Sequence, residues 1–505
     1  MQGSDDAAVK PANGARRHAP EWVILWLACI AQFMVILDVS VVNVALPSIG
    51  RDLHYSATGL QWVVNAYVLT FAGFLLLGGR AADLYGRRRV FLFGLFLFTA
   101  ASLVGGFAQS SAWLTTARAV QGIGGAVLSP ATLTIIITTF SGKRLARALG
   151  MWGAMGGAGG AIGVLLGGIL TAELSWRWVL FINVPIGIAA ALVAATFLGE
   201  ARGVGPRQRL DVPGALTITA GLGALVYSIV NTDVHPWGSW QTLTGLAIAA
   251  VLIGVFLLLQ LRGKAPLMPL RLFRLRSLTG ANIVMLLVGA GFFSMWYFLS
   301  LFLQDVLRFG PLKAGFAFLP MGIAIIIAAQ ITSRLLPSLG ARRLLLAGTL
   351  LAAGGFFWLS RIGPGSTYWG DVFGPGVLVS FALGVLFTPL ASAATMDLPR
   401  SEAGLGSGLL NTARQIGGSI GLAALATLAT SHTHSLEQAG VPVPSATTEG
   451  FARAFVAASI LSAVAFLAAL LVPRHGRAPE LETQAVGPGP PEGRPTTTVA
   501  TPAEA

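Results

Sequence analysis

The chain has 505 residues, of which 54% are hydrophobic and only 10% are charged, and its mean hydropathy is +0.74. Soluble domains carry about 25% charged residues. A chain with so little charge cannot cover itself with a water-facing surface, so its composition excludes a soluble globular protein and indicates a membrane protein with many spans.

The net charge of +13 could indicate nucleic-acid binding, but the cations lie in alternate loops between apolar runs and form no continuous basic patch. Cys29 is the single cysteine, which excludes disulfides and thiolate metal sites. The chain has neither a His-Glu-x-x-His motif nor a Gly-Lys-Ser/Thr phosphate loop. We therefore predict that the protein is not an enzyme and has no metal and no cofactor.

Apolar runs of suitable length for membrane helices recur along the whole chain. Each is about 20 residues long, enough to cross a hydrocarbon core of about 30 Å. None shows the strict alternation of a β-barrel strand. We predict an all-α integral membrane protein with fourteen spans at roughly 22–46, 59–79, 89–108, 112–139, 147–171, 177–199, 212–231, 243–262, 278–304, 314–336, 342–361, 370–394, 404–430 and 453–473.

The lysines and arginines predict the orientation of these spans. One side of the membrane receives 25 of them and the other side 6, and Arg118 and Arg414 lie inside spans. By the positive-inside rule, we expect both termini in the cytoplasm of a multi-pass protein of the cell membrane. Residues 1–21 and 474–505 are polar or rich in Pro, Gly and Thr, and we predict that both are disordered.

The most charged connection in the first two hundred residues is Gly-Arg-Ala-Ala-Asp-Leu-Tyr-Gly-Arg-Arg-Arg at 79–89. Its glycines allow a tight reversal, its arginines hold that reversal on the cytoplasmic side, and its aspartate provides a counter-charge. We predict a conformational hinge formed by Gly79, Asp83, Gly86, Arg87 and Arg88.

An internal repeat appears when the chain is shifted by 254 residues. The shift places Gly86 on Gly340, and Gly163 on Gly417. We therefore predict two parallel six-helix halves, at 22–199 and 278–473, with a two-helix insert and its cytoplasmic linkers at 200–277. Halves related by an axis along the membrane normal are a transporter architecture, in which the substrate path lies between them.

Asp38 and Arg118 are predicted to lie at similar depth inside their spans. A charge at mid-bilayer costs about 2.5–3.5 kcal/mol on insertion scales, so it usually faces a partner or a transport path. Our hypothesis is that Asp38 takes up and releases a proton while Arg118 biases its charge state. The alternative is a static structural ion pair.

Other residues in the spans are weaker candidates. Glycines spaced by three and four residues on the fifth span predict a face for sliding or for static helix packing, and they are Gly153, Gly156, Gly160, Gly163 and Gly167. Polar or aromatic residues could line a substrate cavity or serve interhelical packing, and they are Asn43, Trp62, Asn65, Tyr67, Gln121, Trp296, Gln304, Asn411 and Arg414.

Several of these motifs together resemble one family. The stretch 79–89 resembles the loop signature of the major facilitator superfamily. Its drug:proton antiporter branch with fourteen spans has motifs similar to Leu-Asp-Val-Ser at 37–40, Arg-Ala-Val-Gln-Gly at 118–122, Phe-Ile-Asn-Val-Pro at 181–185 and Asn-Thr-Ala-Arg-Gln-Ile-Gly at 411–417. The glycines of the fifth span resemble the antiporter motif of this branch. One departure is Val164, which follows Gly163 where that motif has a proline.

The resemblance implies a proton-coupled exporter of lipophilic drugs or antibiotic natural products, driven by the proton gradient. It also implies that Asp83 and the hinge arginines lock the outward-facing state. The expected partners are a lipophilic small molecule, protons and membrane lipid, with no nucleic acid, and we expect a monomer.

Because Asp38 is the only deep carboxylate, neutral or weakly charged substrates fit better than dications. The alternatives are an importer of a small nutrient and a non-transporting membrane sensor or scaffold.

Overall fold

The structure is a computed structural model that describes residues 20–474, apart from residue 57 and the segments 200–209, 264–265 and 400–401. Most of the two predicted tails and part of the linker after residue 199 lie outside the described residues. Within the described part, the regular elements are all helical.

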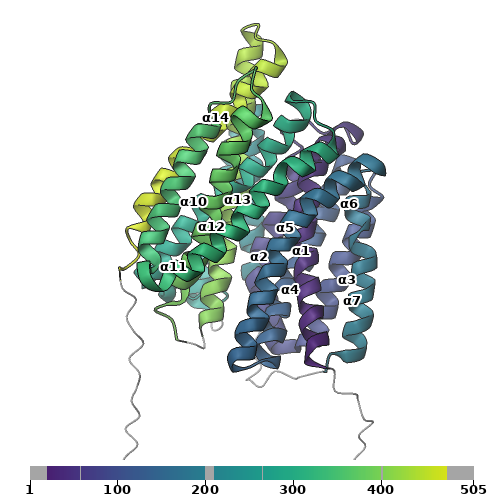
Figure 1. Cartoon of the computed structure of the whole chain (residues 1–505), viewed down its shortest axis with the longest axis vertical. Coiled ribbons are helices and arrows are strands. Elements are labelled where there is room, and N and C mark those ends of the chain that lie inside the picture. Colours follow the sequence, from purple (N-terminus) through teal and green to yellow (C-terminus); the bar gives the residue numbers. More distant parts are fainter. Residues whose placement is uncertain (1–19, 57, 200–209, 264–265, 400–401, 475–505) are drawn as a thin grey trace, which may run out of the picture.

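The first part of the chain forms one bundle of helices (Figure 1). Its helices are α1 (Glu21–Asp52), α2 (Trp62–Tyr85), α3 (Arg87–Gly106), α4 (Ser111–Thr139), α5 (Gly142–Glu173), α6 (Trp178–Phe181) and α7 (Asn183–Phe197). We call the two ends of the molecule the Glu21 end and the Asp52 end, after the first and last residues of α1.

The last part of the chain forms a second bundle beside the first (Figure 1). Its elements are α10 (Arg276–Leu301), the π-helix η3 (Phe302–Val306), α11 (Pro311–Leu359), the π-helix η4 (Tyr368–Val372), α12 (Phe373–Thr395), α13 (Ala403–Gln438) and α14 (Val443–Ala469). α1 begins and α14 ends at the same end of the molecule, and the α13–α14 hairpin projects at the Asp52 end.

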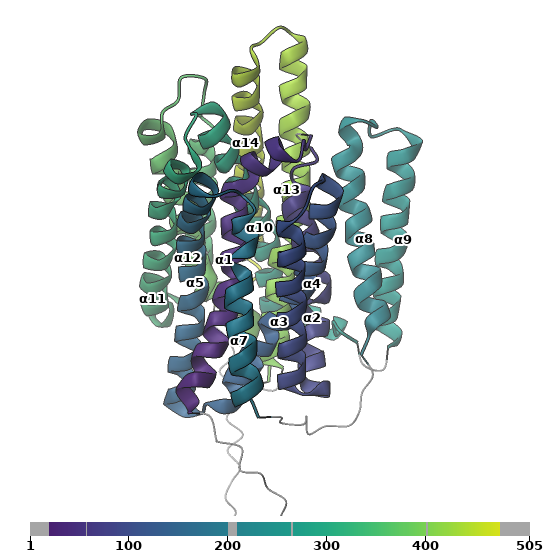
Figure 2. The same ribbon diagram turned by 90° about the vertical axis from the view of Figure 1, so that its right-hand side faces the viewer.

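The remaining helices form a separate hairpin at the side of the molecule (Figure 2). They are α8 (Val212–Val230), the short 3-10 helix η1 (Asn231–Asp233) and α9 (Trp240–Arg262), and the 3-10 helix η2 (Leu270–Arg274) follows them. α8 packs against α2 and α13, one helix from each bundle. The hairpin therefore bridges the two bundles along one edge of their interface.

The count of fourteen spans stays a prediction. In the described part of the chain, twelve helices are long and apolar enough to cross a membrane. The predicted span 314–336 and nearly all of the predicted span 342–361 fall within α11, which has 49 residues. A straight helix of that length would measure about 74 Å, far more than a hydrocarbon core of about 30 Å. α13 is long but lies outside the twelve, and it carries Asn411, Arg414 and Gln415 in its first half.

The predicted repeat explains the break in α11. Gly340 interrupts that helix with a φ of 75°, and Gly86 ends α2 with a φ of 95°. Both values lie in the left-handed region that glycine adopts without steric cost. The two glycines are 254 residues apart, so the repeat places the same backbone reversal at the same point of each half.

The two bundles are tied together at the Asp52 end. Ser300 donates a hydrogen bond to the carbonyl of Asn43 at 2.6 Å, and Gln304 donates to the carbonyl of Val44 at 2.8 Å. Arg51 and Asp305 form an ion pair at 3.4 Å and are also 254 residues apart. Equivalent positions of two related halves meet only near the axis that relates them, so this contact agrees with an axis between α1 and α10.

Candidate functional site

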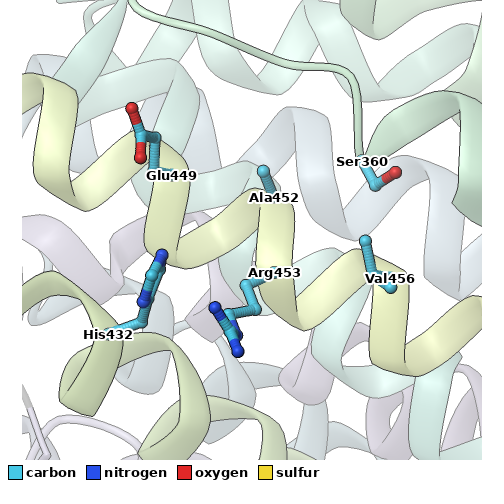
Figure 3. A pocket seen from close by; sticks show the side chains of 6 residues that line it. All are labelled: Ser360, His432, Glu449, Ala452, Arg453 and Val456. Atoms are coloured by element: carbon cyan, nitrogen blue, oxygen red, sulfur yellow. The ribbon is translucent and has the colours of Figure 1, made fainter.

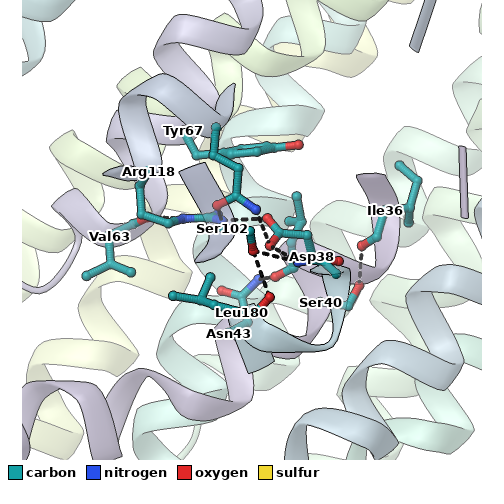
Figure 4. Close-up of polar contacts among 12 residues, drawn as sticks. Ile36, Asp38, Ser40, Asn43, Val63, Tyr67, Ser102, Arg118 and Leu180 are labelled. Atoms are coloured by element: carbon teal, nitrogen blue, oxygen red, sulfur yellow. Dashed lines mark hydrogen bonds and ion pairs between the residues drawn. The ribbon is translucent and has the colours of Figure 1, made fainter. Parts of the chain in front are cut away.

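A buried ion pair lies inside the first bundle, between α1 and α4 (Figure 4). The Nη1 atom of Arg118 donates to Oδ2 of Asp38 at 2.5 Å. The side chain of Asp38 is fully buried, and Arg118 is only 2% exposed. The structure thus joins the two charges that the sequence predicts at similar depth.

Neighbouring amides complete the hydrogen bonding of Asp38. Gln121 lies one turn after Arg118 on α4, so both face α1. It accepts a bond from Arg118 at 2.8 Å and donates one to Oδ1 of Asp38 at 2.8 Å. Asn183, the first residue of α7, donates to the same Oδ1 atom at 3.0 Å. The carboxylate therefore receives a donor from each of three side chains.

The network continues to α3 and α6. The amide of Asn183 also donates to Oγ of Ser102 at 3.1 Å, and Ser102 donates to the carbonyl of Leu180 at 2.8 Å. Leu180 belongs to the short helix α6, which precedes the start of α7 at Asn183. The chain of bonds therefore joins Asp38 to the α6–α7 junction.

α2 contacts Arg118 from the other side. Nε of Arg118 donates to the carbonyl of Val63 at 3.1 Å, and the guanidinium lies 4.4 Å from the centre of the Tyr67 ring. A cation over an aromatic face gains about 2 kcal/mol when both groups are desolvated. α2 also contacts α13 of the second bundle. Arg118 is thus bonded to a helix that lies at the interface between the bundles.

This arrangement can make the contacts between helices sensitive to the charge of Asp38. A buried carboxylate is stable as an anion only while a cation and hydrogen-bond donors compensate its charge. Protonation of Asp38 cancels its attraction for Arg118 and turns one acceptor oxygen into a donor. Proton uptake by Asp38 would therefore change the contacts of α1, α4 and α7 at this point.

Ser102 and Asn183 are the members of the network that sequence reasoning did not select as site residues. Asn183 lies within the noted Phe-Ile-Asn-Val-Pro motif, and a polar amide inside an apolar span is itself a signal of an interhelical bond. Its partner Asp38 is 145 residues away, so the sequence alone does not reveal the pairing.

The other predicted cavity residues fall into two groups. Asn43, Asn65, Tyr67, Gln121 and Gln304 are buried in contacts between helices. Trp62, Trp296, Asn411 and Arg414 are partly exposed. Trp62 packs against Tyr227 of α8 with ring centres 6.4 Å apart, and Asn65 accepts a bond from Ser419 of α13 at 3.2 Å. Trp62 therefore contacts the side hairpin, and Asn65 contacts the second bundle.

The predicted hinge lies at the Glu21 end, between α2 and α3. Gly79 approaches Pro130 of α4, and Gly86 forms the reversal described above. Arg88 donates to the carbonyl of Ala195 at the end of α7 at 2.6 Å, and Arg87 is partly exposed. The side chain of Asp83 lies outside the described part of the structure, so its predicted role as a lock stays a prediction.

The glycines of α5 form a shorter contact face than predicted. A Cβ atom at Gly163 would lie 2.7 Å from Cβ of Ser40, and one at Gly167 would lie 2.7 Å from the carbonyl oxygen of Val41. At Gly153 and Gly160, a Cβ atom would meet nothing within 4 Å. Gly156 lies outside the residues whose surroundings are described. Gly159, which was not predicted, also packs on α1.

At Val164, α5 is an uninterrupted helix that contacts the second bundle. α5 runs as one helix from Gly142 to Glu173, through the position where the antiporter motif has proline. The carbonyl oxygen of Val164 lies 2.9 Å from where a Cβ atom on Gly315 of α11 would stand. α5 therefore contacts α1 on one side and the second bundle on the other.

A surface cavity of about 420 Å³ lies at the Asp52 end, between α13, α14 and the end of α11 (Figure 3). Its lining residues are Ser360, His432, Glu449, Ala452, Arg453 and Val456. It lies outside the buried network of Asp38. Among the described residues, no cluster of His, Cys, Asp and Glu side chains has an arrangement that could hold a metal ion.

Comparison with known families and relatives agrees with this architecture. Residues 28–422 match the family model of the Major Facilitator Superfamily. The chain is 45% identical to the cephamycin export protein of Amycolatopsis lactamdurans over 413 residues, which are 81% of this chain and 85% of that protein. It is 37% identical to a puromycin resistance protein of Streptomyces alboniger over 480 residues, covering 93% and 95% of the two chains.

Comparison with solved structures shows the same fold. The chain is similar to a bacterial homologue of the human lysosomal transporter Spinster, with a TM-score of 0.62 and 17% sequence identity. The match covers 91% of this chain and 99% of the other. At this level of identity, the likeness concerns the fold alone.

Proposed function

The chain belongs to the major facilitator superfamily, and from this membership we propose that it exports antibiotic natural products or similar lipophilic compounds across the cell membrane in exchange for protons. The export or resistance functions named for its relatives support the direction and the substrate class. The single structural observation that supports the coupling is the buried Asp38–Arg118 pair, since a proton on Asp38 would cancel its negative charge.

The proposed cycle begins with Asp38 as an anion bonded to Arg118. Proton binding from the outside of the cell weakens that pair and frees α1 and α4 to change their contacts with the other helices. Substrate then leaves to the outside, and release of the proton to the cytoplasm restores the pair. We further propose that both termini are cytoplasmic, since most cations lie on their side. The Glu21 end is then the inner end, and the proton gradient is the energy source.

Drug accumulation in cells tests this proposal. In a bacterial host without its own exporters, expression of the chain should lower the intracellular level of puromycin or of a cephamycin, and a protonophore should restore it. An empty vector is the control. Expression that raises the intracellular level would support import instead. Identical levels with and without the chain, for a panel of antibiotics, would contradict export.

Asn183 is proposed to position Asp38 for the proton. Asn183→Ala removes the donors to Asp38 and Ser102, and hydrogen bonds to charged groups contribute about 1.5–3 kcal/mol each. We therefore expect export by this variant to slow about tenfold or more, since about 1.4 kcal/mol is a factor of ten. The measurement is the initial rate of dye export as a function of pH, because a positioning role should alter the pH profile. Loss of rate at every pH in equal proportion would indicate a purely structural role.

A further inference from the structure

One strongly polar side chain remains outside the network of Asp38. Arg414 lies about 16 Å along α13 from its first residue, Ala403, by the rise of an α-helix. Its backbone packs against Gly289 in the middle of α10. The guanidinium therefore lies inside the second bundle, at a depth where an ionised group is costly and usually functional.

Arg414 lacks the compensation that Arg118 receives. Its Nη2 atom donates to Oδ1 of Asn411, one turn earlier on α13, at 2.7 Å. Its Nε atom is buried and has no hydrogen-bond partner. Among the ion pairs of the described residues, none joins Arg414 to a carboxylate. Arg118, in contrast, bonds to Asp38, Gln121 and a carbonyl.

The contacts of α13 establish which way Arg414 points. Between Gly408 and Gly421, three faces of the helix are covered, by α10 at Gly417 and Gly421, by α2 at Gly408 and Ser419, and by α8 at Ile416 and Ile420. α14 packs on α13 farther along, at Ala429 and Thr433. The helical period of 3.6 residues places Asn411, Arg414 and Gly418 on the remaining face, opposite α8. Since α8 lies at the edge of the interface, this face is directed toward the interior between the two bundles. Arg414 itself is partly exposed.

One aromatic side chain lies at this face, and an aromatic cluster lies elsewhere on α10 and α11. Phe293 of α10 contacts Gly418, one turn after Arg414. Phe292 packs edge-to-face on Trp296 at 5.9 Å, and Trp296 stacks on Phe318 of α11 at 4.9 Å. Nε1 of Trp296 is buried without a hydrogen-bond partner. The second bundle therefore offers an uncompensated cation, an unused donor and an aromatic surface.

From this arrangement we infer that the exported compounds include lipophilic organic acids, whose carboxylate or sulfonate binds Arg414 while their rings pack on Phe293. A guanidinium binds a planar or trigonal oxyanion with two parallel hydrogen bonds, which the free Nε atom allows. This inference rests on the proposed export function. It differs from the expectation of neutral or weakly charged substrates. That expectation was based on the carboxylates in the spans and did not take Arg414 into account.

Membrane energetics favour the same substrate class. An anion that leaves the cell moves with the inside-negative membrane potential, so its charge assists export. Substrate binding also supplies the counter-charge that Arg414 lacks. The bound anion would therefore lower the cost of keeping a cation inside the bundle.

Two dyes with the same rings test the inference. The acid is 8-anilinonaphthalene-1-sulfonate, and the neutral compound is N-phenyl-1-naphthylamine. Fluorescence titration of the purified full-length protein in detergent should give a dissociation constant for the acid that rises about tenfold or more in Arg414→Gln, corresponding to about 1.4 kcal/mol. The constant for the neutral dye should change less than twofold. Arg414→Lys should recover part of the affinity for the acid.

Arg361→Gln is the matched control, since Arg361 is an exposed cation that stacks on Phe357 at the Asp52 end. It should leave both dissociation constants unchanged. Equal weakening of both dyes in Arg414→Gln would indicate a structural role and overturn the inference, as would unchanged binding of the acid. A wild type that binds only the neutral dye would also overturn it. Binding in detergent needs no proton gradient, so failure of proton coupling would leave this difference between the dyes intact.

Discussion

Asp38→Asn is expected to abolish proton-driven export. The substitution keeps the shape of the side chain but removes the carboxylate on which the proposed coupling depends. Arg118 would then keep its hydrogen bonds to Gln121 and Val63 without a counter-ion. The measurement is the rate of puromycin or cephamycin export from energised cells. We expect this rate to fall to the level of cells without the protein.

The loss of a counter-ion also affects stability. Removing one partner of a buried ion pair costs about 3–5 kcal/mol, because the other charge is left uncompensated. The double variant Asp38→Asn/Arg118→Gln removes both charges and should recover most of the thermal stability of the purified protein. It should remain inactive, which separates loss of coupling from loss of folding.

Asp52→Asn is the matched control for this prediction. Asp52 lies on the same helix and also pairs with an arginine, Arg177, at 2.7 Å. That pair is partly exposed, and exposed pairs contribute about 0–1 kcal/mol. We expect export by Asp52→Asn to stay within about twofold of the wild type, on that basis. Full export by Asp38→Asn, in protein that is folded and present in the membrane, would refute the role of Asp38.

Gly167→Ala is expected to lower export strongly, because the added methyl group does not fit between α5 and α1. Its new methyl group would stand 2.7 Å from the carbonyl oxygen of Val41, and the backbone of α1 would have to move away from α5. Overpacking of this kind costs about 1–3 kcal/mol. Val41 lies one turn after Asp38, so the displacement would reach the ion pair. We expect a fall in export of about tenfold, since about 1.4 kcal/mol is a factor of ten, together with a lower melting temperature.

Gly160→Ala makes the same chemical change on the same helix. A Cβ atom there meets nothing within 4 Å, and alanine is a better helix former than glycine by about 1 kcal/mol. We expect unchanged export and an equal or slightly higher melting temperature. Equal losses in the two variants would mean that the glycines act through backbone flexibility and not through contact with α1.

The sequence predicts the features that follow from local chemistry. A charge inside an apolar run needs a partner, so Asp38 and Arg118 can be selected and matched in depth before the fold is known. The repeat is also visible, because the reversals at Gly86 and Gly340 both need a residue that tolerates positive φ. These features depend on single residues or on a fixed offset along the chain.

Features that depend on helix packing are harder to predict. The spacing of the glycines shows which face of α5 is smooth, but how far that face stays in contact with α1 depends on the crossing of the two helices. The bond from Asn183 to Asp38 joins segments 145 residues apart, and only the packing of α7 against α1 brings them together. The direction of Arg414 likewise follows from the three helices that cover α13 between Gly408 and Gly421.

The most direct test of the account is proton-driven transport by the purified protein in liposomes. A pH gradient that is acidic inside should drive accumulation of the naphthyl dye that the wild type binds more tightly. The same gradient should drive none in liposomes that contain Asp38→Asn, and a pH-sensitive dye trapped inside should report proton efflux only with the wild type. Accumulation that persists without the gradient, or that is equal in the two proteins, would contradict proton-coupled export through Asp38.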